Sequence, residues 1–206
     1  MRVQVLLSDP MSGTISGSGF WIGTEGLVVT CWRNVSNSPD GIIIIRSEAT
    51  GGQVKGKLIA QDIHKNLAII KVVPNPFLEA NGKSSSPNPR LKAATPAPNL
   101  PQVGDKLFLA VKQANHTNFD VQEQPVSAVR PVKELGSELK ILLSDVTRFG
   151  TSGEPVVDGS GQVVGILEGV YPSLDRAQWG STEVVIPVQA ILDLVQGAPV
   201  PPPSRE

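Results

Sequence analysis

Apolar residues recur along the first half of the chain in short runs, and their spacing predicts β-strands. The runs are separated by glycine-containing turn signals roughly ten residues apart, which is typical of a β-barrel or a β-sandwich. The segments expected to form these strands are 3–7, 19–22, 27–30, 42–46 and 53–59. A further strand is expected over 66–73, where an apolar run indicates a buried position.

A second series of strands is predicted after an irregular connection. Residues 74–103 hold seven prolines among Ser, Asn and Ala, so we expect this stretch to link two lobes. The strands expected beyond it are 106–111, 121–129, 138–143, 155–157, 163–167 and 182–186. Helical spacing follows at 188–195, directly after Pro187, so the second lobe is expected to end in a short helix.

Composition and charge narrow the class of protein without defining its function. The 206 residues carry a net charge of −1 with both signs interspersed, so neither a nucleic acid nor a membrane surface is an expected partner. No apolar run is long enough to span a membrane, and the first residues lack the pattern of a signal peptide. Cys31 is the single cysteine, which excludes an intrachain disulfide. Because secreted domains usually carry disulfides, we expect a cytoplasmic location.

The histidines and the cysteine give little support for a metal site. His64 and His116 lie far apart in the sequence, and with Cys31 they do not form a ligand cluster. Cys31 stands in an apolar run, where a small buried side chain is the simpler interpretation. No metal or cofactor is therefore expected.

The strongest local motif is a serine placed between glycines, Gly150-Thr151-Ser152-Gly153. A tight turn of this kind exposes the serine hydroxyl and frees successive backbone N–H groups to bind a developing oxyanion. Ser152 is therefore a candidate nucleophile, and Gly150 is a candidate residue of the oxyanion hole. The structural alternative is a turn that simply requires a small polar residue.

Together with other segments, this turn resembles the trypsin-like serine proteases, and within them the HtrA/Deg type. Segments 17–22 and 26–32 look like the opening strands that lead to the catalytic histidine. Segment 60–72 looks like the strand that carries the catalytic aspartate, and 184–188 with the helix after it looks like the closing part of the domain. The resemblance covers roughly residues 3–196.

The resemblance implies an all-β protein of two six-stranded antiparallel β-barrels, the trypsin-like or chymotrypsin fold, with a short C-terminal helix. Its protease-like domain would span residues 1–196. The expected parts are an N-terminal barrel over about 1–73, an inter-barrel linker over about 74–103, a C-terminal barrel over about 104–186, a C-terminal helix over about 187–196 and a Pro-rich tail over 197–206. A tail of this composition favours a connection to a further domain.

Two residues depart from the catalytic pattern that the resemblance implies. Arg33 stands at the position of the histidine, and Asn66 stands at that of the aspartate. Arginine has no lone pair to accept a proton, and asparagine lacks the charge that would stabilise a protonated base. Asn34, the neighbouring candidate for the histidine position, is not a base either. Ser152 is thus the one residue of the triad that is retained.

Two further side chains bear on the expected site. Glu154 takes the place of a glycine that the family usually carries, so its carboxylate could crowd a substrate or lie near Arg33. We hypothesise that a contact of Arg33 with Ser152 or with Glu154 replaces the lost network. His64, on a predicted loop before Asn66, is a candidate displaced base, and a surface histidine is the alternative.

These residues leave three functions open. The first is a pseudoprotease that binds a peptide or protein segment by strand addition to the second barrel, which needs backbone groups and no triad. The second is an active serine endopeptidase that uses Ser152 with a non-standard or partner-supplied base, and the third is a structural scaffold with a closed cleft. The resemblance places the binding residues at Gly165, Ile166, Leu167, Glu168 and Gly169 on the rim, at Val146 on the floor of an apolar pocket, and at Glu154.

Overall fold

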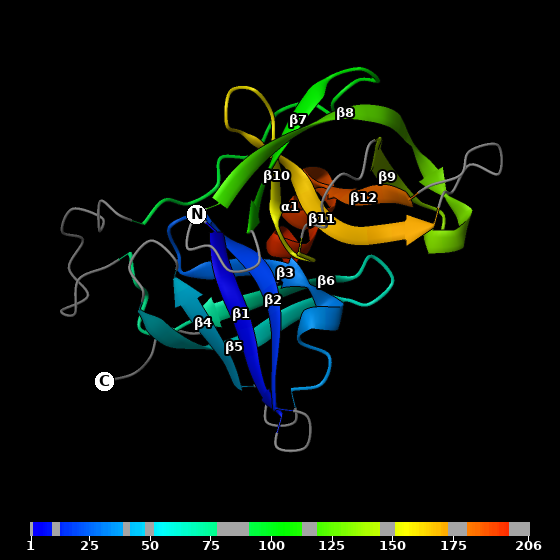
Figure 1. The fold of residues 1–206 in the computed structure, drawn as a ribbon. Helices are drawn as coiled ribbons and strands as arrows, with labels where there is room; N and C mark the ends of the chain where they lie inside the picture. The colour runs from blue at the N-terminus through cyan, green and yellow to red at the C-terminus, as the bar shows by residue number, and fades with distance from the viewer. Residues whose placement is uncertain are drawn as a thin grey trace.

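The computed structural model consists of two antiparallel β-barrels joined by an irregular connection, with a short helix packed behind them (Figure 1). The residues that the structure describes are 2–9, 13–38, 42–47, 52–77, 91–112, 119–144, 151–172 and 181–197. The two-barrel chymotrypsin fold predicted from the sequence is therefore confirmed. No helix within these ranges is both long and apolar enough to cross a membrane.

The N-terminal barrel closes in the order β1-β2-β3-β6-β5-β4. Its strands are β1 (Arg2–Asp9), β2 (Gly13–Ile22), β3 (Leu27–Cys31), β4 (Ile42–Ser47), β5 (Gln53–Asp62) and β6 (Leu67–Val72). Alternate residues of these strands point inward, so that Val3, Val5, Ile43 and Ile45 pack around Trp21 in its core. A 3₁₀ turn, η1 (Trp32–Asn34), directly follows β3 and carries Arg33.

The C-terminal barrel closes in the order β10-β11-β12-β9-β8-β7. Its strands are β7 (Lys106–Lys112), β8 (Phe119–Val132), β9 (Glu138–Leu143), β10 (Pro155–Val157), β11 (Val163–Pro172) and β12 (Ser181–Pro187). A second 3₁₀ turn, η2 (Lys133–Leu135), joins β8 to β9, and helix α1 (Val188–Gly197) follows β12. The pairing of β11 with β12 is irregular between Leu167 and Gly169, where the register shifts by one residue.

The two barrels share a buried apolar interface. One core cluster combines Phe20 and Ile69 of the N-terminal barrel with Ile166 and Ile186 of the C-terminal barrel, and Ile191 of α1 belongs to the same cluster. Burial of such side chains stabilises a fold by roughly 1.5–3 kcal/mol each, so the interface holds both lobes in a fixed relative position. Residues at the junction of the two barrels are therefore held in fixed positions by this packing.

Strand β2 begins six residues before the predicted segment 19–22, and two glycines lie in its middle. A Cβ on Gly17 would overlap the Asn34 side chain, and a Cβ on Gly19 would lie too close to the Val29 carbonyl. Glycine inside a strand commonly marks a close approach of this kind. The predicted linker part 78–90 and the tail 198–206 lie outside the described residues.

Candidate functional site

The Ser152 turn lies where the C-terminal barrel meets the N-terminal barrel. The Ser152 carbonyl accepts hydrogen bonds from the Ser18 N–H and from Asn34 Nδ2, each at 2.9 Å. Gly153 has a φ of +95°, its N–H donates to the Leu167 carbonyl at 2.8 Å, and a Cβ there would overlap the backbone of Ser18. Only glycine fits this conformation without strain, so the turn that presents the serine hydroxyl is fixed by backbone contacts with both barrels.

The Arg33 side chain reaches across this junction to Ser152. Its Nε–H donates a hydrogen bond to Ser152 Oγ at 3.0 Å, so the Arg33–Ser152 contact expected from the sequence is present. The guanidinium also hydrogen bonds the Tyr171 side chain on β11. It passes directly over Gly169, because a Cβ at that position would overlap Nη2 of Arg33. Arg33 nevertheless remains exposed to solvent.

Asn66 supports Arg33 from the turn that precedes β6. Its Oδ1 accepts the backbone N–H of Arg33 at 3.0 Å, and its carbonyl accepts the N–H of Trp32 at 3.0 Å. Asn66 has a φ of +56°, a left-handed conformation that asparagine adopts more readily than most residues. Its Nδ2 donates to Glu168 Oε1 at 3.4 Å, which fixes the orientation of the amide.

Glu168 and Lys140 form a buried ion pair beneath this layer. Lys140 Nζ lies 2.7 Å from Glu168 Oε2, and the two side chains are 1% and 7% exposed. Glu168 falls at the register shift between β11 and β12, and such an irregularity re-aims a side chain relative to the regular alternation. From the sequence, Glu168 was expected on an open rim. Lys140 was not singled out, because a lysine in an apolar strand does not indicate a distant partner.

Cys31 lies fully buried below Ser152, at the end of β3. Its thiol donates to the Leu167 carbonyl at 3.4 Å. Burial raises the pKa of the Cys31 thiol to about 11, although a hydrogen bond from Ser152 and the charge of Arg33 act in the opposite direction. The thiol therefore stays protonated at neutral pH and cannot accept a proton from the serine.

We expect this burial to make stability depend on pH above the ordinary thiol pKa of 9.0. A group whose pKa is raised on folding stabilises the fold fully below its unfolded value, and this contribution is lost as pH rises through the interval up to about 11. Between about pH 8 and about pH 10 the free energy of unfolding should fall by about 1 kcal/mol more in the wild type than in Cys31→Ala. Urea denaturation at both pH values measures this difference, and identical pH dependence in the two proteins would contradict it.

The other residues singled out from the sequence have different placements. Glu154 directly precedes β10 and is fully buried, so its carboxylate does not face solvent beside Ser152. His64 is exposed in the turn before Asn66. Gly150, Val146 and His116 lie outside the described residues, so their predicted roles stay predictions.

The predicted binding rim is only partly free. Gly165 and Ile166 pair with β10 on one side and with β12 on the other. The Leu167 N–H and carbonyl are bonded to Glu154 and Gly153 at 2.8 Å each. Beyond Leu167, no strand within the described ranges pairs with the second edge of β11. Within the described ranges, β11 from Gly169 onward is therefore paired on one edge only, by β12.

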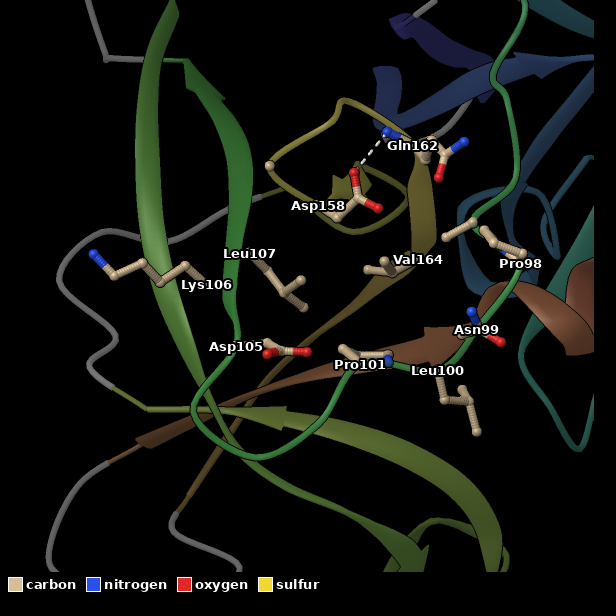
Figure 2. Close-up of a pocket in the computed structure, with 12 residues that line it drawn as sticks. Pro98, Asn99, Leu100, Pro101, Asp105, Lys106, Leu107, Asp158, Gln162 and Val164 are labelled. Carbon is tan, nitrogen blue, oxygen red and sulfur yellow. Dashed lines mark hydrogen bonds between the residues drawn. The ribbon is translucent and has the colours of Figure 1, made fainter.

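A separate cavity of about 440 Å³ lies on the C-terminal barrel (Figure 2). It is lined by Ala97, Pro98, Asn99, Leu100, Pro101, Asp105, Lys106, Leu107, Asp158, Gly159, Gln162 and Val164. Although burial opposes ionisation of Asp158, hydrogen bonds from Ser160 and Gln162 lower the pKa of its carboxyl. Asp158 Oδ1 accepts the Gln162 N–H at 2.9 Å, which closes the loop at the edge of the cavity (Figure 2). The lining includes neither Ser152 nor Arg33, so the cavity is distinct from the candidate site.

Comparisons with known proteins identify a family and a shared fold. The family described as trypsin-like peptidase domain matches residues 17–166, a range that contains Arg33, Asn66 and Ser152. Among solved structures, the active form of the Rv3671c protease from M. tuberculosis is similar, with a TM-score of 0.69 and 18% sequence identity. The similarity covers 97% of this chain and 82% of that one, and at this identity it establishes the fold alone. No curated protein matches the sequence.

Proposed function

Because this chain belongs to the family of trypsin-like peptidase domains, we propose that it is a pseudoprotease, which binds a peptide or protein segment beside Ser152 without cleaving it. One observation carries the proposal: the Nε–H of Arg33 donates to the Ser152 hydroxyl at 3.0 Å. This distance is the reach within which a general base must act. The position beside the hydroxyl that a general base would occupy therefore holds a hydrogen-bond donor, the Arg33 guanidinium.

The chemistry of the neighbouring groups supports the absence of turnover. A serine hydroxyl becomes a nucleophile when a base takes its proton, and a guanidinium is charged at every physiological pH and offers no lone pair. The Cys31 thiol is protonated, and the Asn66 amide is neutral. The Glu168 carboxylate lies 2.7 Å from Lys140 Nζ, so its charge is already compensated. The described contacts of the hydroxyl therefore provide no acceptor for the proton.

Peptide binding needs none of these catalytic groups. An extended segment that adds to the open edge of β11 would gain backbone hydrogen bonds from Gly169 onward, in the mode of β-strand addition. The lone buried cysteine is consistent with the cytoplasm as the proposed compartment. The proposed partner is accordingly an extended peptide or a protein segment.

A fluorophosphonate probe tests this proposal directly, because it reacts covalently with activated serines. We expect the wild-type protein to be labelled no faster than Ser152→Ala, since the nucleophile has no base. Mass spectrometry of the intact protein quantifies the label, and an active trypsin-like protease treated in parallel controls for the reagent. Labelling that depends on Ser152 would instead support the active endopeptidase that the sequence left open.

A further inference from the structure

The Arg33 guanidinium carries a charge that the described acidic residues do not neutralise. The ion pairs within the described ranges join Lys65 to Asp62, Lys106 to Glu123 and Lys140 to Glu168. Glu168, the carboxylate beneath the site, is bound by Lys140 at 2.7 Å and by Asn66 at 3.4 Å. Arg33 is exposed, and of its five N–H groups the contacts with Ser152 and Tyr171 use only part.

The position of this guanidinium is held from several sides. Asn66 binds the backbone N–H of Arg33 at 3.0 Å, and Ser152 binds its Nε at 3.0 Å. The absence of a side chain at Gly169 makes room for Nη2 over β11. A cation that is already ordered loses less conformational entropy when it binds an anion. Arg33 therefore differs from a surface arginine that points freely into solvent.

Ser152 adds a second donor to this cation. Because the Nε–H of Arg33 occupies a lone pair of Ser152 Oγ, the hydroxyl is left to donate its own hydrogen. Its available partner below is the Cys31 sulfur, which is a weak acceptor compared with an anion. A carboxylate can accept from the guanidinium and the hydroxyl together, and charge-assisted hydrogen bonds of this kind are the strong ones.

The position of the serine relative to a bound segment indicates which carboxylate fits. In proteases of this kind, the serine oxygen faces the main-chain carbonyl carbon of the bound segment. A segment that ends at that point presents its terminal carboxylate there, whereas an internal residue presents a neutral amide. Given the proposed function, on which this inference rests, we propose that Arg33 and Ser152 bind the C-terminal carboxylate of a peptide. This group is the one that hydrolysis of a peptide bond produces.

Two peptide libraries of identical composition test the inference. Both are randomised at their final positions, and one ends in a free carboxylate while the other ends in an amide. The immobilised protein is offered an equimolar mixture, and mass spectrometry measures the ratio of captured peptides. We expect at least about tenfold enrichment of the free acids, as for a hydrogen bond to a charged group. High salt should reduce the enrichment, because the site is exposed.

Single-residue variants show which side chain produces the enrichment of free-acid peptides. Arg33→Gln should remove the enrichment, and Arg33→Lys should retain part of it, because a lysine keeps the charge without the planar fork. Gly169→Ala should reduce it by displacing the guanidinium while leaving the charge in place. Arg130→Gln removes another exposed arginine, on β8, and should leave the enrichment unchanged.

The outcomes separate the inference from the proposed function. Equal capture of free acids and amides would overturn recognition of the terminal carboxylate and would leave peptide binding standing. The same result is expected if Arg33 binds acidic side chains of the peptides, because both libraries contain them equally. An enrichment that survives Arg33→Gln would place the carboxylate elsewhere and overturn the inference as well. Capture of neither library would overturn both.

Discussion

Replacing Arg33 by histidine and Asn66 by aspartate together should accelerate fluorophosphonate labelling of Ser152 by about 10²- to 10⁴-fold, the range that a positioned general base contributes. Arg33 Nε already lies 3.0 Å from Ser152 Oγ, so the backbone position can direct a side chain to the hydroxyl. Asn66 Oδ1 already bonds the Arg33 N–H at 3.0 Å, which places residue 66 beside it. The two substitutions thus introduce a base at the position that contacts the serine, and a charged partner beside that base.

The single substitutions should give much smaller gains. Arg33→His alone leaves a neutral amide at position 66, and in chymotrypsin-type proteases an asparagine in place of the aspartate lowers kcat by about 10⁴-fold. Asn66→Asp alone leaves the guanidinium on the hydroxyl. The introduced aspartate would also lie near Glu168, whose Oε1 is 3.4 Å from Asn66 Nδ2, and like charges raise a carboxyl pKa. We therefore expect the double variant to fall at the lower end of the range.

The control for this experiment is the same double variant with Ser152→Ala, which should show no labelling. Labelling of the double variant should rise with pH through the region where a histidine loses its proton. A folded double variant that is labelled no faster than the wild type would show that Ser152 is held in an unreactive geometry. In that case the inactivity that we propose would not depend on Arg33 and Asn66.

The sequence predicts most of the strands and the closing helix because hydrophobic spacing is a local signal. The arrangement of these strands as two barrels was implied by the resemblance to trypsin-like proteases. The proximity of Arg33 and Ser152 was expected from the resemblance, since both align with residues that meet in the family. The buried pair was not predicted, because the alternation of Glu138-Leu139-Lys140 gives no reason to place the lysine inside. In the structure Lys140 is 1% exposed and Leu139 is 38% exposed. A contact between residues 28 positions apart decides this orientation, and local patterns do not report it.

The binding rim was predicted to begin at Gly165, but Gly165 and Ile166 pair with β10 on one side and with β12 on the other. The apolar run 163–167 marks the strand correctly, but its hydrogen-bond partners depend on β10 and on the Ser152 turn. The register shift between Leu167 and Gly169 turns Glu168 toward Lys140, and no residue type in this segment indicates such a shift. The roles expected of Val146 and Gly150 stay predictions, because both lie outside the described residues.

Glu168→Gln should lower the free energy of unfolding by about 3–5 kcal/mol, because it leaves the Lys140 charge buried without its counter-charge. The two charged atoms lie 2.7 Å apart, with side chains 1% and 7% exposed, so water cannot replace the lost partner. Adding Lys140→Met to Glu168→Gln removes both charges, while the introduced amide can still accept from Asn66 Nδ2. Replacing a buried ion pair by uncharged groups often leaves stability unchanged. The free energy of unfolding of the double variant should therefore return to within about 1 kcal/mol of the wild-type value.

The exposed pair of Lys106 and Glu123 provides the matched control, since its atoms also lie 2.7 Å apart but its side chains are 67% and 48% exposed. Glu123→Gln should change stability by no more than about 1 kcal/mol, because solvent screens such a pair. Urea denaturation measures all of these variants. If Glu168→Gln cost no more than Glu123→Gln, the Glu168 carboxylate would not be committed to Lys140. It would then be available to pair with Arg33, and a peptide carboxylate would have to compete with Glu168 for the guanidinium.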